Sequence, residues 1–203
     1  MKRSLIALVL LAVLPVAASA SDLSYNYVEG GYTRINGIGP KVDGAAINGS
    51  IALGSRFHVF GGYESLEFPG QMAVIGGGTT IQSFDVDVDS WNLGFGYNHS
   101  LSQSTDLVAR LGYRDSDFDS PFGGSSVGLE TYFTEVGARS QLMPNLEGYL
   151  YVGYEKTDGT GQSGDYYGRL GGQYNFNPSW GLVADAKFGD GAEQYFVGPR
   201  FSF

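Results

Sequence analysis

The sequence predicts an all-β fold, a closed antiparallel up-and-down transmembrane β-barrel of ten strands, with eight strands as the alternative. Two observations carry this prediction. Short stretches of alternating polarity recur along the chain, and beyond the N-terminus no apolar run reaches the length of a membrane-spanning helix. A chain that crosses lipid without helices must close its sheet, because the hydrocarbon core offers no hydrogen-bonding partner to free backbone groups.

The N-terminus has the pattern of a signal peptide. A basic pair at 2–3 precedes an apolar run over 5–16 and the small residues Ala-Ser-Ala at 18–20. The run is shorter than the roughly 20 residues that a spanning helix needs. We expect residues 1–20 to be the signal peptide and residues 21–203 to be one outer-membrane β-barrel domain; a short N-terminal anchor helix is the alternative.

Composition narrows the function classes. The chain has 21 Asp and Glu against 12 Lys and Arg, a net charge of -9; loss of Lys2 and Arg3 leaves 10 basic residues against 21, or -11. Such a chain has no basic patch for phosphates, which argues against nucleic acid as a partner. It contains no cysteine, so an exported fold cannot rely on disulfides.

A glycine next to an aromatic or apolar residue marks most expected strands, as in HVFGGY (58–63) and NLGFGY (92–97). Each strand has about 8–13 residues, enough for a tilted strand to cross a bilayer. Their even spacing leaves no room for helices, and eight strands would remain if 44–53 or 181–188 paired poorly. The ten expected strands are 23–35, 44–53, 56–65, 86–98, 106–117, 128–140, 147–157, 166–176, 181–188 and 193–203.

The expected connections alternate in length, with short turns at one end and longer loops at the other. This asymmetry is typical of the periplasmic and extracellular ends of outer-membrane barrels. The longest expected loop is 66–85. Its apolar, Gly-rich part (72–78) would form an adhesive patch, extend the strands or fold over the barrel mouth.

The uncharged phase of each strand should face lipid. In 86–98 that phase holds Trp91, Leu93, Phe95 and Tyr97, and the other strands give the same result: aliphatic residues flanked by aromatic ones. A soluble ligand-binding barrel, the alternative, would place its charges outward and its apolar residues in the lumen.

The opposite phase should line a narrow lumen, where glycines leave room for long side chains. Facing charges are expected to cross the space as hydrogen-bonded pairs. Two functions remain open: a polar plug that closes the tube, or a narrow ion or small-solute pore. The predicted lumen residues are Glu29, Glu64, Arg110, Arg114, Glu135, Arg139, Glu155, Arg169, Asp185, Lys187 and Arg200.

Two alternating acidic clusters should lie at the extracellular rim. They are a divalent-cation site or a solvated rim that shares ions with lipopolysaccharide phosphates. The second cluster begins like an EF-hand loop, but Ser120 and Ser126 stand where that loop needs Gly and Glu. The predicted rim residues are Asp85, Asp87, Asp89, Asp115, Asp117 and Asp119.

Catalysis is not expected. The two histidines, His58 and His99, fall at the short-turn end, far from the acidic clusters. Without cysteine they cannot build a zinc site, and no Ser-His-Asp set shares a rim. The sequence therefore predicts no enzyme, no catalytic residue, no metal and no cofactor.

The signal-like N-terminus, LSYNYVEGGY (23–32), HVFGGY (58–63) and the terminal YFVGPRFSF together resemble the sulfation-dependent quorum factor family of small outer-membrane proteins. The likeness covers nearly the whole chain, and LSYNYVEGGY is its most specific part. It implies an OmpA-type outer-membrane barrel, also found in secreted vesicles, in a family named for roles in quorum signalling and host immune recognition. It implies no catalytic residues.

The last strand alternates with aromatic residues in one phase. Outer-membrane barrels typically end on such a strand, and by resemblance Tyr195, Phe201 and Phe203 form the recognition signal for the barrel assembly machinery. Pro199 has no N–H, so it should sit at a gap or bulge in the pairing.

The expected function is structural or in surface, host or biofilm interaction through the extracellular loops. The alternative is the narrow pore, and an outer-membrane enzyme comes third. Expected partners are outer-membrane lipid and lipopolysaccharide, the assembly machinery, and a host or cell-surface molecule. We expect a monomer.

Overall fold

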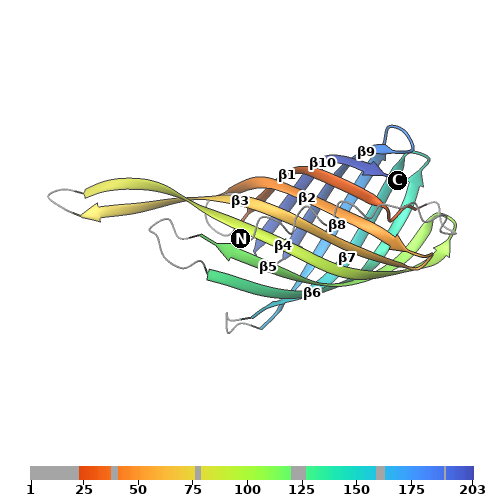
Figure 1. Ribbon diagram of the computed structural model, residues 1–203, viewed down its shortest axis with the longest axis horizontal. Helices are drawn as coiled ribbons and strands as arrows, with labels where there is room; N and C mark the ends of the chain where they lie inside the picture. Colours follow the sequence, from red (N-terminus) through yellow and green to blue (C-terminus); the bar gives the residue numbers. More distant parts are fainter. Residues whose placement is uncertain (1–22, 38–40, 76–78, 120–126, 159–162, 190) are drawn as a thin grey trace, which may run out of the picture.

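The computed structural model describes residues 23–37, 41–75, 79–119, 127–158, 163–189 and 191–203, with side chains described outside 71–85. Ten strands form one closed sheet in the order β1-β10-β9-β8-β7-β6-β5-β4-β3-β2 (Figure 1). The strands are β1 (Tyr27–Asn36), β2 (Val42–Leu53), β3 (Phe57–Ile75), β4 (Thr79–Ser102), β5 (Thr105–Phe118), β6 (Val127–Met143), β7 (Leu146–Thr157), β8 (Asp165–Asn175), β9 (Trp180–Gly189) and β10 (Ala192–Ser202).

Each strand pairs antiparallel with its neighbours, and β1 closes the barrel on β10, with Tyr27 opposite Ser202. The predicted all-β, ten-stranded, up-and-down barrel is therefore confirmed, and the eight-stranded alternative is excluded. The described residues contain no helix long and apolar enough to cross a membrane.

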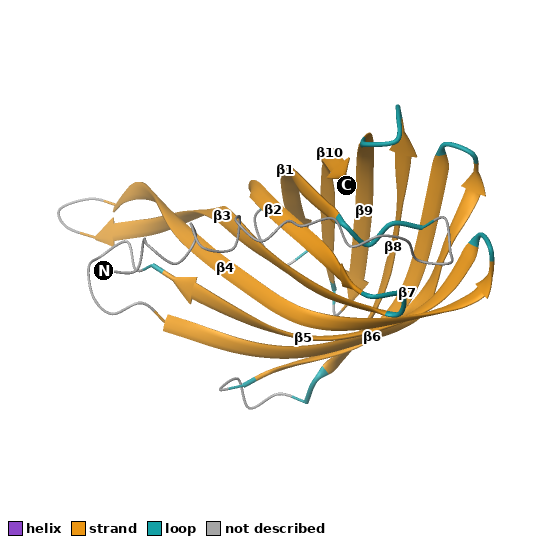
Figure 2. Cartoon of the chain, turned by 45° about the vertical axis from the view of Figure 1, so that its right-hand side comes forward, coloured by secondary structure: helices purple, strands orange, loops and turns teal. Residues whose placement is uncertain are grey.

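The hairpin between β3 and β4 extends well beyond the other strands (Figure 2). Its pairing continues from Glu67 opposite Asp87 to Ile75 opposite Thr79. The prediction of a long loop over 66–85 is therefore wrong, and the alternative that this part extends the strands is confirmed for the described residues, because paired backbone satisfies its own hydrogen bonds and carries the sheet outward from the barrel. All of the proposed adhesive patch (72–78) lies within 71–85, where side chains are not described, and 76–78 lie outside the described residues.

The expected first strand, 23–35, begins too early. β1 starts at Tyr27, and Leu23 and Tyr25 are 1 % and 3 % exposed. Both pack against Val108 and Tyr151, side chains on the inner faces of β5 and β7. Alternation alone assigned 23–26 to the wall, but burial of two large apolar groups favours their place inside the barrel.

Pro199 sits at the predicted gap in the closing seam. The pairing of β1 with β10 runs to Glu29 opposite Arg200 and resumes at Tyr32 opposite Val197. A side chain on Gly31 or Gly198 would overlap the backbone of the facing strand. The two strands thus approach closely where no Pro N–H is available to bond.

The outward phase forms an apolar band. Leu93, Leu111 and Leu150 are 56 %, 62 % and 61 % exposed, which no water-facing surface would favour for three aligned leucines. Outward aromatic side chains also contact one another, as where Phe57 contacts Phe95 and Tyr97. This distribution is the one expected of a lipid-facing surface.

On the inner face, aromatic rings lie over glycines of the neighbouring strand. A Cβ on any of these glycines would overlap the ring, so each glycine gives the ring a flat place against the wall. The pairs are His58 with Gly96, Phe60 with Gly94, Phe133 with Gly112, Tyr151 with Gly137, Tyr167 with Gly153 and Tyr149 with Gly171.

Candidate functional site

The lumen is the candidate site. The structure places all eleven predicted lumen residues on the inner phase, and none of them is fully exposed. It adds two carboxylates from the same phase, Asp106 and Glu147, which are 0 % and 8 % exposed. The expected strands 106–117 and 147–157 begin at these two residues, and their alternation already puts both in the charged phase.

At the short-turn end, the segment 23–26 closes the lumen. The Tyr25 ring stacks on His58 at 4.6 Å, and its hydroxyl donates to Asp106 at 3.0 Å. Asn26 accepts the backbone N–H of Ala52 at 2.8 Å through its side-chain oxygen. These contacts tie the segment to β2, β3 and β5, on one side of the barrel.

Arg139 ties the same segment to the other side. Its Nη2 donates to Glu147 at 2.5 Å and its Nη1 donates to the Ser24 carbonyl oxygen at 2.8 Å. The guanidinium also lies 5.0 Å from the Tyr25 ring centroid. Arg139 is only 4 % exposed, so these partners replace the water that its charge has lost.

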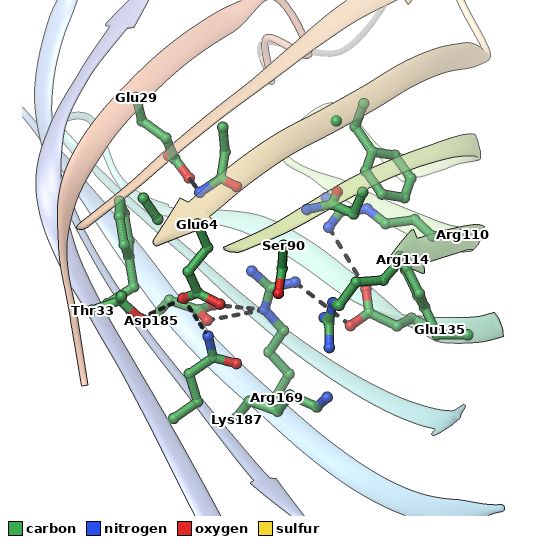
Figure 3. A pocket seen from close by; sticks show the side chains of 18 of the residues that line it. Glu29, Thr33, Glu64, Ser90, Arg110, Arg114, Glu135, Arg169, Asp185 and Lys187 are labelled. Carbon is green, nitrogen blue, oxygen red and sulfur yellow. Dashed lines mark hydrogen bonds and ion pairs between the residues drawn. The ribbon is translucent and has the colours of Figure 1, made fainter. Parts of the chain in front are cut away.

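Glu135 is the centre of the next layer (Figure 3). It is 3 % exposed and accepts a hydrogen bond from the Tyr167 hydroxyl at 3.1 Å. Arg110 and Arg169 approach it from two sides at 3.7 and 3.6 Å. Arg169 also donates through Nε to Asp185 at 2.9 Å, so charges of β5, β6, β8 and β9 are linked along one side of the lumen.

Further ion pairs line the lumen wall. Lys187 donates to Glu155 at 2.7 Å, and Arg114 lies 3.9 Å from the same carboxylate. At the seam, Arg200 donates to Glu29 at 2.7 Å. The predicted pairing of lumen charges is confirmed, but the prediction that the pairs join facing walls is wrong: each one joins neighbouring strands or strands two apart, because these side chains meet a partner along the wall before they reach across the space.

Glu64 differs from the other acidic groups. Its carboxylate accepts hydrogen bonds from the Thr33 hydroxyl and the Gln194 amide, both at 2.8 Å. Within the described part of the chain it forms no ion pair. Glu64 is therefore a negative charge held by neutral donors.

A cavity of about 120 Å³ lies between these groups, bordered by Glu64, Arg110, Arg114 and Glu135. Ser90 and Asn92 of β4 complete its wall. A single water needs roughly 10–15 Å³, so the cavity has room for several waters or for a solute of a few non-hydrogen atoms.

Beyond the charged layers, the inner face changes character. Val42, Leu66 and Val88 are buried in an apolar cluster that includes Phe68 and Phe118. These residues share the inner phase with the lumen charges, so the polarity of the wall inverts above the membrane band. The alternation D-V-D-V-D thus places valines inward and carboxylates outward.

The acidic rim lies on the outer face of these extensions. Asp89 and Asp117 stand directly opposite each other on β4 and β5, and Asp115 accepts a hydrogen bond from Trp91 Nε1 at 3.2 Å. The side chain of Asp85 lies outside the described residues. Among the predicted rim residues whose side chains are described, Asp87, Asp117 and Asp119 are exposed, and Asp89 and Asp115 are half-buried.

The rim is wider than predicted. Glu67 is exposed and stands opposite Asp43 on one side and Asp87 on the other. Hydrogen bonds from Arg34 and Tyr32 hold the pKa of Asp43 below its usual value. In the described part of the chain, no three acidic or imidazole groups converge to hold a metal ion.

The three residues of the predicted assembly signal face outward on the closing strand. Tyr195 and Phe203 are each 37 % exposed. Phe201 contacts Trp180 of the neighbouring strand at 5.1 Å and Phe203 at 6.2 Å.

Comparison with known proteins places the fold. No protein-family model and no curated protein matches the sequence. The translocator domain of the autotransporter NalP from Neisseria meningitidis matches with a TM-score of 0.58 and 14 % identity, over 90 % of each chain. The NanC porin matches with a TM-score of 0.54 and 7 % identity, over 87 % of this chain and 100 % of its own.

The β domain of the Bordetella autotransporter BrkA matches with a TM-score of 0.52 and 15 % identity, over 87 % of this chain and 98 % of its own. The chain therefore has the fold of an outer-membrane β-barrel. At these identities the likeness concerns the fold alone.

Proposed function

We propose that the chain is a small outer-membrane β-barrel whose lumen is closed at rest, and that it acts structurally or in surface interactions through its extracellular extensions. The observation that carries the proposal is the filling of the lumen. Segment 23–26, the ion pairs of Arg139 and Glu135, and the apolar cluster around Val88 lie in successive layers.

The surface role follows from what the barrel exposes. The β3–β4 hairpin extends past the other strands, and carboxylates cover the described outer face of its base. Such a surface suits a cationic partner, or lipopolysaccharide phosphates bridged by divalent ions. Membership of the quorum factor family, release in vesicles, a host or cell-surface partner and a monomeric, non-enzymatic state belong to the same proposal.

A narrow pore is the second candidate. The central cavity and the side chains of Arg114 and Arg169, which are 31 % and 32 % exposed, favour it. A continuous path would need segment 23–26 and the apolar cluster around Val88 to rearrange, so that water could reach these groups from both ends.

Conductance across a planar lipid bilayer separates the two. A closed barrel is expected to give no steady current, with rare openings at most. Steady ohmic steps from the wild-type protein, altered in size by Glu135→Ala, would overturn the closed state and support the pore.

Removal of 70–82 tests the surface role. A chain shortened there keeps the β3–β4 pairing from Phe57 opposite Tyr97 to Pro69 opposite Asp85 and should still assemble. It is expected to bind less to cells, lipopolysaccharide and biofilm matrix than the full chain does. Unchanged binding to all three would count against a role for this hairpin.

A further inference from the structure

The central cavity has a basic wall and an acidic wall. On the side of β5 to β9, four cations face three carboxylates, which leaves one positive charge in excess. On the side of β1 to β3, Glu64 is a negative charge without a cation among the described residues. The groups of the basic wall are Arg110, Arg114, Arg169, Lys187, Glu135, Glu155 and Asp185.

Two arginines of the basic wall have N–H groups that make no hydrogen bond to the carboxylates beside them. Arg110 Nε is buried and finds no acceptor among the described residues, and the Arg110 Nη1 to Glu135 distance is 3.7 Å. The Arg114 Nη1 to Glu155 distance is 3.9 Å. Both distances exceed that of a hydrogen bond, so these guanidinium groups are attracted to carboxylates without being saturated by them.

Aromatic rings keep the two arginines in place without using their N–H groups. The Arg110 guanidinium lies 5.4 Å from the ring centroid of Phe60 and 4.9 Å from that of Tyr151. Arg114 lies 5.8 Å from the ring of Phe133. A guanidinium held through its face presents its edge, and the edge is what binds a carboxylate.

The two walls are spaced for one small molecule. Glu64 stands opposite Ser90, and Arg114 stands opposite Asn92, so β4 separates the acidic from the basic pole (Figure 3). Two strand spacings are about 10 Å. A molecule with charges of opposite sign a few bonds apart would span the gap, with a hydrogen bond at each end.

We infer that this cavity binds a small zwitterion, a molecule with a carboxylate and an ammonium group, as in a free amino acid. The carboxylate accepts hydrogen bonds from Arg110 and Arg114, and the ammonium donates to Glu64. A ligand with only a negative charge would be repelled by Glu64. A ligand with only a positive charge would be repelled by the excess positive charge of the arginines.

Titration followed by NMR tests this. The arginine Nε–H signals of the purified barrel in lipid nanodiscs are monitored while free glycine, acetate or methylammonium is added. Free glycine is expected to shift the Arg110 and Arg114 signals saturably, with acetate and methylammonium weaker by about tenfold or more, since each lacks one charge-assisted hydrogen bond.

Two variants separate the poles. Glu64→Gln keeps the side-chain shape and is expected to lower the affinity for free glycine to that for acetate. Arg114→Met removes the charge but keeps the stem over Phe133, and is expected to weaken both glycine and acetate. Arg34→Met changes an arginine paired with Asp43 outside the cavity and serves as control.

Correct folding of each variant is checked by its heat-dependent gel mobility. Equal binding of acetate and free glycine, unchanged by Glu64→Gln, would mean an anion site and overturn the inference. Absence of any saturable shift in the wild-type protein would overturn it as well. Neither result affects the closed lumen or the surface role, which rest on conductance and on the β3–β4 hairpin.

Discussion

At the residue scale, the aromatic rings that lie flat over glycines on the inner face determine how much free space the barrel encloses. A ten-stranded barrel encloses little space, and aromatic side chains that pointed to the axis would compete with the ion pairs for it. Laid flat over glycine, a ring covers the wall and leaves the axis to charged groups. Tyr167, over Gly153, also donates to Glu135, so packing at the wall orients the charge network.

Gly153→Ala tests this arrangement. The added Cβ would overlap the Tyr167 ring and force it away from Glu135. Overpacking of this kind costs about 1–3 kcal/mol of unfolding free energy. Urea unfolding in detergent micelles would measure the loss.

Gly168→Ala in the same hairpin is the matched control. Its Cβ would meet nothing within 4 Å, so the stability should stay near that of the wild-type protein. Equal stability of the two variants would show that the ring does not depend on the glycine.

Alternation is the strongest signal at the scale of the strand. It predicted which phase of β4 faces lipid, because a period of two leaves each residue a single choice of side. It failed where a chain segment leaves the sheet. Nothing local in 23–26 differs from a strand; the partners that draw Tyr25 inward, such as Asp106 and Arg139, are distant in sequence.

The β3–β4 hairpin shows a second limit. Its glycines and apolar residues were interpreted as a loop, yet the strands stay paired because inward valines and outward carboxylates continue the period beyond the membrane. The ion-pair partners in the lumen could not be predicted from the sequence either. The alternation predicted that Arg169 faces the lumen, but its pairing with Asp185 depends on the shape of the closed barrel.

Leu93→Arg and Asn92→Arg test the two faces of β4. Leu93 is 56 % exposed on the apolar band, where an arginine near the midplane of the bilayer costs about 2–4 kcal/mol. Asn92 borders the cavity, where a long polar side chain finds water and carboxylates. Membrane insertion is measured by protease resistance and should fail for Leu93→Arg but not for Asn92→Arg. Equal insertion of both variants would refute the assignment of the two faces.

The closing strand carries its own prediction. Deletion of Phe203 removes one ring of the proposed assembly signal and the backbone bond from Phe203 N–H to Asn26 at 3.2 Å. Assembly in cells is expected to fall severalfold, while barrels refolded in detergent lose little stability. Phe176→Ala removes another exposed aromatic residue from the same end and should assemble normally.

At the scale of the whole molecule, closure of the sheet and closure of the lumen are linked. β1 seals the wall by pairing with β10, and the four residues before it seal the short-turn end of the lumen. The plug is thus anchored at the seam and extends to the opposite wall, where Arg139 and Glu147 hold it. Loosening it should open a path without breaking the barrel.

Tyr25→Ala provides the test. The substitution removes the stack on His58, the hydrogen bond to Asp106 and the ring beneath Arg139, while β1 to β10 keep their pairing. Conductance across a planar bilayer is expected to rise from rare openings to steady steps, because water replaces the ring between the charged groups. Tyr32→Phe, which alters a hydroxyl at the rim, should leave conductance at the wild-type level. If Tyr25→Ala stays silent while folding normally, the charge network and the apolar cluster around Val88 close the lumen without it, and 23–26 is a lining of the wall.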